Sequence, residues 1–84
     1  MNLTFTPDGW DDYLYWETTD KVVLRRLNRL IEDALRTPFE GLGQPEQLRH
    51  QLAGCWSRRL TQEHRLVYRV TADAVVVLMA RYHY

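Results

Sequence analysis

The sequence predicts an α+β fold in which an N-terminal strand and two helices pack on one face of a mainly antiparallel β-sheet. Apolar side chains recur at every third or fourth position between residues 20 and 36, as in an amphipathic helix. From about Gln47 onward they tend to alternate with polar ones, as in strands. No repeat or linker interrupts the chain, so we expect residues 1–84 to form a single domain with one modest core.

The first half of the chain predicts one short strand and two helices. Residues 2–5 alternate in polarity, and Thr6 and Pro7 are suited to cap and begin the helix that follows. The clearest helix lies within residues 18–38, where Pro38 marks its end. We expect its charged side chains to face away from the core: Arg25, Arg26, Arg29, Glu32 and Asp33.

The second half predicts strands within residues 47–52, 55–61, 64–71 and 74–84, and the short gaps at 62–63 and 72–73 favour hairpins. The last of these strands is apolar at every position from Val75 to Met79, which is typical of a strand buried on both faces. We therefore expect it to lie inside the sheet. Its pattern leaves the register open, and with it the face on which His83 emerges.

The hairpin within residues 55–71 can be aligned in two ways. A turn with an odd number of residues places Arg59 directly opposite Arg65 and leaves an apolar face of Trp56, Leu60, Leu66, Tyr68 and Val70. A two-residue turn would instead place Arg65 on the apolar face, where an uncompensated charge is costly. We favour the odd turn, and two like charges opposite each other then suggest that an anion binds between them.

Charge is balanced overall but unevenly distributed. Residues 1–45 hold eight acidic and five basic side chains, whereas residues 46–84 hold three acidic side chains and six arginines. A basic half suggests a polyanionic partner, although a sheet and a helix pair can differ in surface charge without one. A single cysteine, Cys55, and the lack of a signal peptide or long apolar run favour the cytoplasm and argue against a membrane protein.

The side chains able to do chemistry are acid–base and cationic groups, although small α+β domains often contain such residues by chance. The histidines and Cys55 lack metal-binding spacing, and no glycine loop opens a helix to cradle phosphate, so we expect no metal and no cofactor. RNA carries its own nucleophile, the 2′-hydroxyl, and its cleavage needs a base, a cation on the phosphate and an acid. The inventory suits that reaction: Glu46, Arg49, Arg58, Arg59, Arg65 and His83.

Three segments carry a resemblance that spans the chain: WDDYLYWETTDK, RTPFEGLGQPEQLRHQLAGCWSRRLTQEHRLVYRV and the terminal ARYHY. They resemble the YoeB toxins of bacterial toxin–antitoxin modules, within the RelE superfamily. The resemblance implies a ribosome-dependent mRNA endonuclease that cuts the codon in the ribosomal A site. It implies Glu46 as general base, Arg65 as the cation on the transition state, His83 as general acid and Tyr84 as the residue that orients or stacks a nucleotide.

The same resemblance implies phosphate contacts and partners. Arg59 matches a phosphate-binding arginine, and Arg49 stands where the relatives carry lysine, which keeps the charge but alters the geometry. Expected partners are mRNA, ribosomal RNA, a YefM-like antitoxin that folds on binding, a second copy of the chain, and promoter DNA through the antitoxin complex only. Two alternatives are a gyrase-directed ParE-like toxin, which lacks this residue set, and a silent antitoxin-binding co-repressor.

Other residues receive structural interpretations. The aromatic side chains Trp10, Tyr13, Trp16 and Trp56 are expected to be core or dimer contacts rather than platforms for bases. Cys55 is expected to pack in a strand rather than act as a nucleophile. His64 lies beside a turn, and the sequence assigns it no role.

Overall fold

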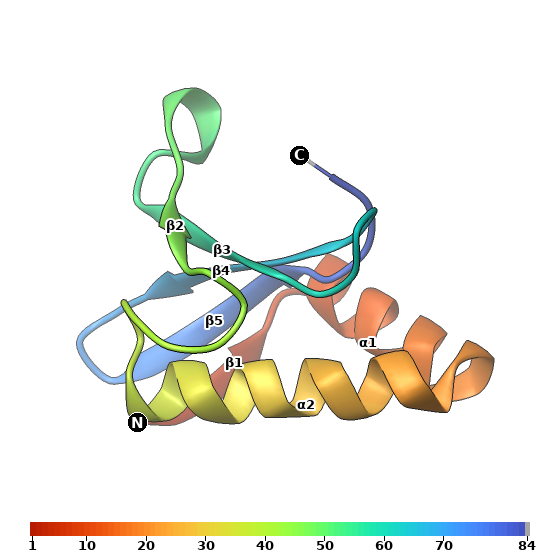
Figure 1. Ribbon diagram of the computed structural model, residues 1–84. Helices are drawn as coiled ribbons and strands as arrows, with labels where there is room; N and C mark the ends of the chain where they lie inside the picture. Colours follow the sequence, from red (N-terminus) through yellow and green to blue (C-terminus); the bar gives the residue numbers. More distant parts are fainter. Residues whose placement is uncertain (84) are drawn as a thin grey trace.

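The computed structural model describes residues 1–83, and a five-stranded sheet with two helices on one face makes up most of them (Figure 1). The strands lie in the order β1-β5-β4-β3-β2. The strands are β1 (Asn2–Phe5), β2 (Glu46–Gln47), β3 (Cys55–Arg59), β4 (Arg65–Val70) and β5 (Ala74–Met79). The helices are α1 (Pro7–Thr19), α2 (Lys21–Arg36) and the short 3-10 helix η1 (His50–Leu52).

The predicted α+β class is confirmed, with one parallel edge. Strand β1 pairs with β5 in parallel, and the remaining neighbours are antiparallel. Strand β5 lies between β1 and β4, as its uniformly apolar composition predicted. Since both of its edges are paired and the helices cover one face, it can carry valine at three consecutive positions.

Side-chain caps fix where both helices begin. The Thr6 hydroxyl accepts a hydrogen bond from the Gly9 amide at 3.1 Å, and Pro7 occupies the first turn, as the sequence predicted. Asp20 caps α2 by accepting from the amides of Val22 and Val23 at 3.0 and 3.1 Å. One residue therefore separates the two helices, which holds them at the sheet as a tight pair.

The main core fills the space between the helices and the sheet. Leu27, Leu30, Ile31 and Ala34 of α2 meet the sheet there, and Trp16 is the buried aromatic of α1. The predicted apolar face of the β3–β4 hairpin belongs to this layer. Its members are Leu60, Leu66 and Tyr68 in the core, with Trp56 and Val70 packed against it.

A smaller cluster lies on the helix-free face of the sheet. Leu48, Cys55 and Val67 are buried together, and Leu52, Leu78 and Met79 pack on them. The segment from Leu48 to Leu52 therefore folds over the sheet beside β2, seen at the top of Figure 1. Cys55 packs there as a small apolar side chain, as predicted.

Two predicted strands are shorter than expected. Of residues 47–52, only Gln47 is in a strand, paired with Trp56, and η1 follows with His50 at a positive φ of 59°. The predicted strand 74–84 ends at Met79 because both polar backbone groups of Ala80 bond to side chains of α1. The chain then turns at Tyr82, whose φ is 60°.

Within residues 1–83, neither long helix has the length and apolarity that a bilayer span requires.

Candidate active site

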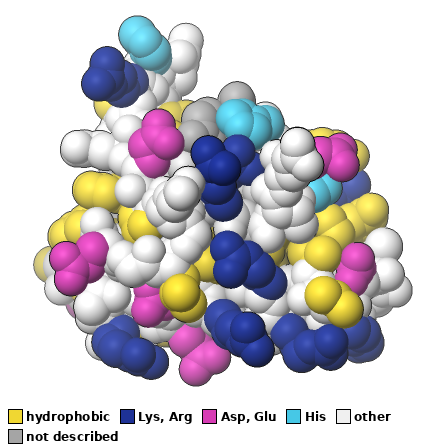
Figure 2. All heavy atoms as spheres, viewed as in Figure 1, with side chains coloured by type: hydrophobic (Ala, Val, Ile, Leu, Met, Phe, Trp, Pro, Cys, Tyr) yellow, Lys and Arg dark blue, Asp and Glu magenta, His cyan; other side chains and the backbone are white. Residues whose placement is uncertain are grey.

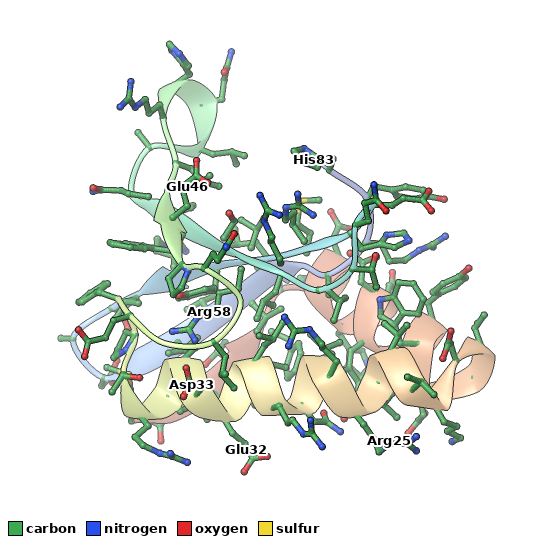
Figure 3. All side chains as sticks on the ribbon, in the orientation of Figure 1. Arg25, Glu32, Asp33, Glu46, Arg58 and His83 are labelled. Atoms are coloured by element: carbon green, nitrogen blue, oxygen red, sulfur yellow. The ribbon has the colours of Figure 1, made fainter. Side chains whose placement is uncertain are left out.

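Four elements bring the predicted site residues to the helix-free face of the sheet. Glu46 of β2 pairs with Ser57 of β3, and Arg59 lies two residues further along the same face. Figure 3 shows Glu46 and His83 on this side of the sheet, while Arg58 and Asp33 lie between the sheet and α2. The helix-free face therefore carries an acidic, a basic and an imidazole side chain.

The register of the strands sets the spacing of these groups. Arg59 pairs directly with Arg65, so the predicted odd turn is confirmed. Neighbouring strands lie about 4.8 Å apart and rise about 3.3 Å per residue, which places the Cα atoms of Glu46 and Arg65 about 12 Å from each other. Figure 2 shows the sheet from its edge, with the helix-free side at the top, and there a Lys or Arg side chain lies between an acidic side chain and a histidine.

Arg65 is half-buried and partly held by its own hairpin turn. Its Nη1 donates to the carbonyls of Thr61, Gln62 and His64 at 2.9, 3.3 and 3.1 Å. These carbonyl dipoles offset part of the repulsion from Arg59 across the hairpin. The turn thus fixes one end of the guanidinium beside a second positive charge, which is an arrangement suited to a phosphate.

Arg49 lies with Glu46 rather than with Arg65. Arg49 and Glu46 line a groove of about 390 Å³, and its other walls are formed by Gln47, Leu48, His50 and Leu52. Leu48 anchors this segment in the smaller apolar cluster. The structure therefore pairs a carboxylate with a flanking cation on one side of the site, and two arginines on the other.

The C-terminal tail, residues 80–83, is tied to α1 and to β4. The Ala80 amide donates to Asp12 Oδ2 at 2.9 Å, and Trp16 Nε1 donates to the Ala80 carbonyl at 2.7 Å. The Arg81 guanidinium stacks 3.5 Å above the Tyr15 ring. The Arg65 amide then donates to the Tyr82 carbonyl at 3.0 Å, which carries the tail back to the arginine pair. Tyr84, predicted to contact a nucleotide, lies outside the described residues.

Arg58 plays a part that the sequence did not reveal. It was counted among the candidate cations, but it is fully buried on the core face of β3. Its guanidinium donates to Asp33 Oδ2 at 2.6 Å, to the Tyr68 hydroxyl at 2.9 Å, and to three carbonyls. Those carbonyls belong to Thr37, Glu40 and Leu42, at 2.8, 3.0 and 3.1 Å. Its alternation with Trp56 and Leu60 was the available signal, because it places Arg58 on their face.

The prediction that five charged side chains of α2 face away from the core is wrong for two of them. Asp33 turns inward because Arg58 would otherwise be an unpaired buried charge. Arg26 donates through Nη2 and Nε to the carbonyls of Arg59 and Leu60, at 3.0 and 3.3 Å. Arg25 and Glu32 do point away from the sheet, as expected (Figure 3).

The network around Arg58 also changes the pKa of two of its members, Asp33 and Tyr68. A hydrogen bond from the Leu42 amide, together with the Arg58 guanidinium, holds the pKa of Asp33 below its usual value of 3.8. Burial raises the pKa of the Tyr68 hydroxyl, against the opposing effect of Arg58. Asp33 is thus ionised and Tyr68 neutral near pH 7, which suits their roles as acceptors from Arg58.

Residues 37–45, the loop before Glu46, are held in shape by the same network. Gly41 has a φ of 114°, and a Cβ there would overlap the Asp33 carboxylate. The Arg59 amide donates to the Gly43 carbonyl at 2.7 Å. Because Arg58 and Arg59 bind this loop to β3, they determine where the chain enters β2 and so where Glu46 lies.

The described residues contain no group of three His, Cys, Asp or Glu side chains arranged to hold a metal ion.

The aromatic side chains differ in their surroundings. Trp16 is buried, as predicted for a core residue, whereas Trp10 is 45% exposed and stacks on Tyr13 with ring centroids 5.6 Å apart.

Solved structures that share this fold over the whole chain include small bacterial toxins. A YoeB/ParE toxin from Agrobacterium tumefaciens is 49% identical, each chain is covered completely, and the TM-score is 0.97. A heterotetrameric YoeB-YefM toxin–antitoxin complex from Staphylococcus aureus matches with 39% identity and a TM-score of 0.91, covering 100% of this chain and 98% of that one. A YoeB dimer from the same organism matches with 39% identity, the same coverage and a TM-score of 0.92.

Sequence comparison identifies the family. Residues 5–84 match the family described as YoeB-like toxin of bacterial type II toxin-antitoxin system. Toxin YoeB of Escherichia coli K12 is 56% identical over 84 residues, which is 100% of both chains. The chain therefore belongs to the YoeB-like toxins of type II toxin–antitoxin systems.

Proposed function

We propose that this toxin is a ribosome-dependent mRNA endonuclease of the cytoplasm, which cuts the codon in the ribosomal A site and so stops translation. One observation carries the proposal: a carboxylate, two guanidinium groups and an imidazole reach the same helix-free face from β2, β3, β4 and the tail. Membership of a family of bacterial toxins adds to it.

The proposed chemistry is attack by the 2′-hydroxyl on the adjacent phosphate. Glu46 takes the proton from the hydroxyl, and the 2′-oxygen forms a bond to phosphorus. The bond from phosphorus to the 5′-oxygen breaks, and His83, as the imidazolium, donates a proton to that oxygen. The products are a 2′,3′-cyclic phosphate and a free 5′-hydroxyl. The reaction needs no metal, because Arg65 stabilises the charge that develops on the phosphate.

The remaining site residues are assigned to binding. Arg59 lies opposite Arg65 and can contact the same or a neighbouring phosphate. Arg49 shares a groove with Glu46 and can bind the RNA strand on the other side of the scissile phosphate. Tyr84 is assigned to orient or stack a nucleotide. Contacts to ribosomal RNA would use further surface arginines, and they should weaken steeply with salt.

The proposed partners are a YefM-like antitoxin and a second copy of the chain. The relative from S. aureus forms both a complex with YefM and a dimer. We expect the antitoxin to fold on this toxin and displace its tail, which would remove His83 from the site. Promoter DNA would be bound only through the antitoxin complex.

Primer extension on mRNA translated in vitro tests the activity. Wild-type protein should produce breaks within codons on ribosomes. We expect Glu46→Gln, Arg65→Ala and His83→Ala each to lower the rate by about 100-fold or more. Arg69→Ala is the matched control, because Arg69 is an exposed arginine on the same face of β4. Breaks that persist at the wild-type rate in the three variants would refute the proposal, as would a wild-type protein that leaves translated mRNA intact.

A further inference from the structure

His64 makes a side-chain bond to the tail. Its Nδ1 accepts a hydrogen bond from the Tyr82 amide, with the two nitrogens 2.6 Å apart. The ring also packs edge-on against Trp16 of α1, with centroids 4.8 Å apart, and tilts against the Tyr82 ring at 5.6 Å. An acceptor at Nδ1 requires the neutral imidazole with its proton on Nε2. The turn between β3 and β4 is thus joined to the tail by a bond of defined direction.

The tail adopts a backbone conformation that needs such support. Tyr82 has a φ of 60°, in the left-handed region that side chains other than glycine seldom adopt. Both of its backbone groups are bonded: the amide to His64, and the carbonyl to the amide of Arg65. This kink directs the next residue, His83, over the sheet on the side where Glu46 lies (Figure 3).

We propose that His64 is a positioning residue, which docks the tail through the Tyr82 amide and thereby holds His83 at the site. This inference rests on the proposed function of His83 as the general acid. His64 itself touches no reacting atom. The Ala80 contacts hold the start of the tail, before the kink. The bond from His64 acts at the kink itself, one residue before His83, where it supports the bond between the Arg65 amide and the Tyr82 carbonyl.

The test compares two substitutions of the same size and shape. His64→Asn keeps an acceptor oxygen close to the position of Nδ1, and His64→Leu replaces that oxygen by a methyl group. Both variants lose the ring contact with Trp16, so a difference between them reports the hydrogen bond. Tail docking is measured by hydrogen exchange of the Arg65 amide, because its acceptor is the Tyr82 carbonyl. The Thr71 amide, bonded to the Ala74 carbonyl at the far end of the sheet, controls for loss of the fold.

We expect the Arg65 amide of the Leu variant to exchange about tenfold faster than that of the Asn variant, the scale of one hydrogen bond. The Thr71 amide should exchange equally in both. Equal protection of Arg65 in the two variants would overturn the anchoring. This measurement involves no RNA, so it decides the anchoring even if the wild-type protein cleaves no mRNA and the proposed function fails.

Kinetics of cleavage then test the positioning role. If the tail carries the acid, His64→Leu should lower kcat relative to His64→Asn and leave KM within about twofold, because the binding arginines are intact. Equal kcat values in the two variants, with Arg65 protection lost only in the Leu variant, would overturn the positioning role while leaving the contact itself. A loss of activity that comes only from a raised KM, with kcat unchanged, would overturn it as well.

Discussion

Replacing Arg58 by leucine should destabilise the protein more than any other substitution of an arginine. The side chain is fully buried and donates five hydrogen bonds, one of them to the Asp33 carboxylate. Leucine fills part of the space but donates none. The carboxylate then loses its cation, and the carbonyls of residues 37–42 lose the donor on which they converge.

The magnitude follows from the kind of bond that is lost. Removing one partner of a buried ion pair costs about 3–5 kcal/mol, mostly because the remaining group is left uncompensated. A domain of this length has a free energy of unfolding of about 4–13 kcal/mol. We therefore expect Arg58→Leu to lose about 4 kcal/mol, which corresponds to a fall of about 20 °C in melting temperature. Arg58→Lys keeps the charge but loses the planar fork, so it should cost about half as much.

Urea denaturation followed by tryptophan fluorescence measures this loss. Arg59→Leu is the matched control, because Arg59 is the next residue of β3 but is exposed on the opposite face. We expect it to change the free energy of unfolding by no more than about 0.5 kcal/mol. It can even stabilise the fold slightly, because it removes the like charge opposite Arg65.

Agreement between Arg58→Leu and Arg59→Leu to within about 1 kcal/mol would refute this reasoning. A second result would also do so. Asp33→Asn should be strongly destabilising in the wild-type background and nearly neutral in Arg58→Leu, because its partner is then already gone. Equal effects in the two backgrounds would mean that the pair is not coupled.

Three further predictions concern acid, anions and the tail. The pKa of Asp33 is lowered in the folded state, so its ionised form contributes stability that is present above its usual pKa of 3.8 and is lost as the pH falls through the folded-state pKa. The difference in unfolding free energy between wild type and Asp33→Asn should therefore shrink as the pH falls below about 5. Inorganic phosphate should raise the melting temperature of wild type and of Arg69→Ala more than that of Arg65→Ala, in calorimetry at constant ionic strength. Deleting residues 83–84 should lower mRNA cleavage about 100-fold or more while the protein stays folded, since the bonds to Ala80 and Tyr82 remain.

Features set by local pattern were predictable from the sequence. The cap at Thr6 and the apolar stripe of α2 identified both helices, because caps and helical periodicity depend on residues close in the chain. The pairing of Arg59 with Arg65 followed from the cost of burying Arg65 in the alternative register. That register is what brings two of the expected site residues together.

Features set by distant polar contacts were not predictable. The last strand ends where it does because of the bond from Trp16 to Ala80, which joins residues 64 positions apart. Asp33 of α2 turns inward because of its bond with Arg58, which lies 25 positions further along the chain. No spacing rule indicates them. His64 shows the same limit: a histidine beside a turn looks unremarkable in sequence, and only the fold places the Tyr82 amide against its ring.

The helix layer supports both ends of a site that it does not touch. Through Asp33, α2 holds Arg58 and the loop that leads to Glu46; through Asp12 and Trp16, α1 holds Ala80 at the root of the tail. The contact of Trp16 with Ala80 is buried, whereas the bond between His64 and Tyr82 is exposed. An antitoxin that displaces the tail, as proposed, therefore needs to break only the outer contacts beyond Ala80. Because the core and the arginine pair would stay in place, such an antitoxin would withdraw His83, the proposed acid, without unfolding the toxin.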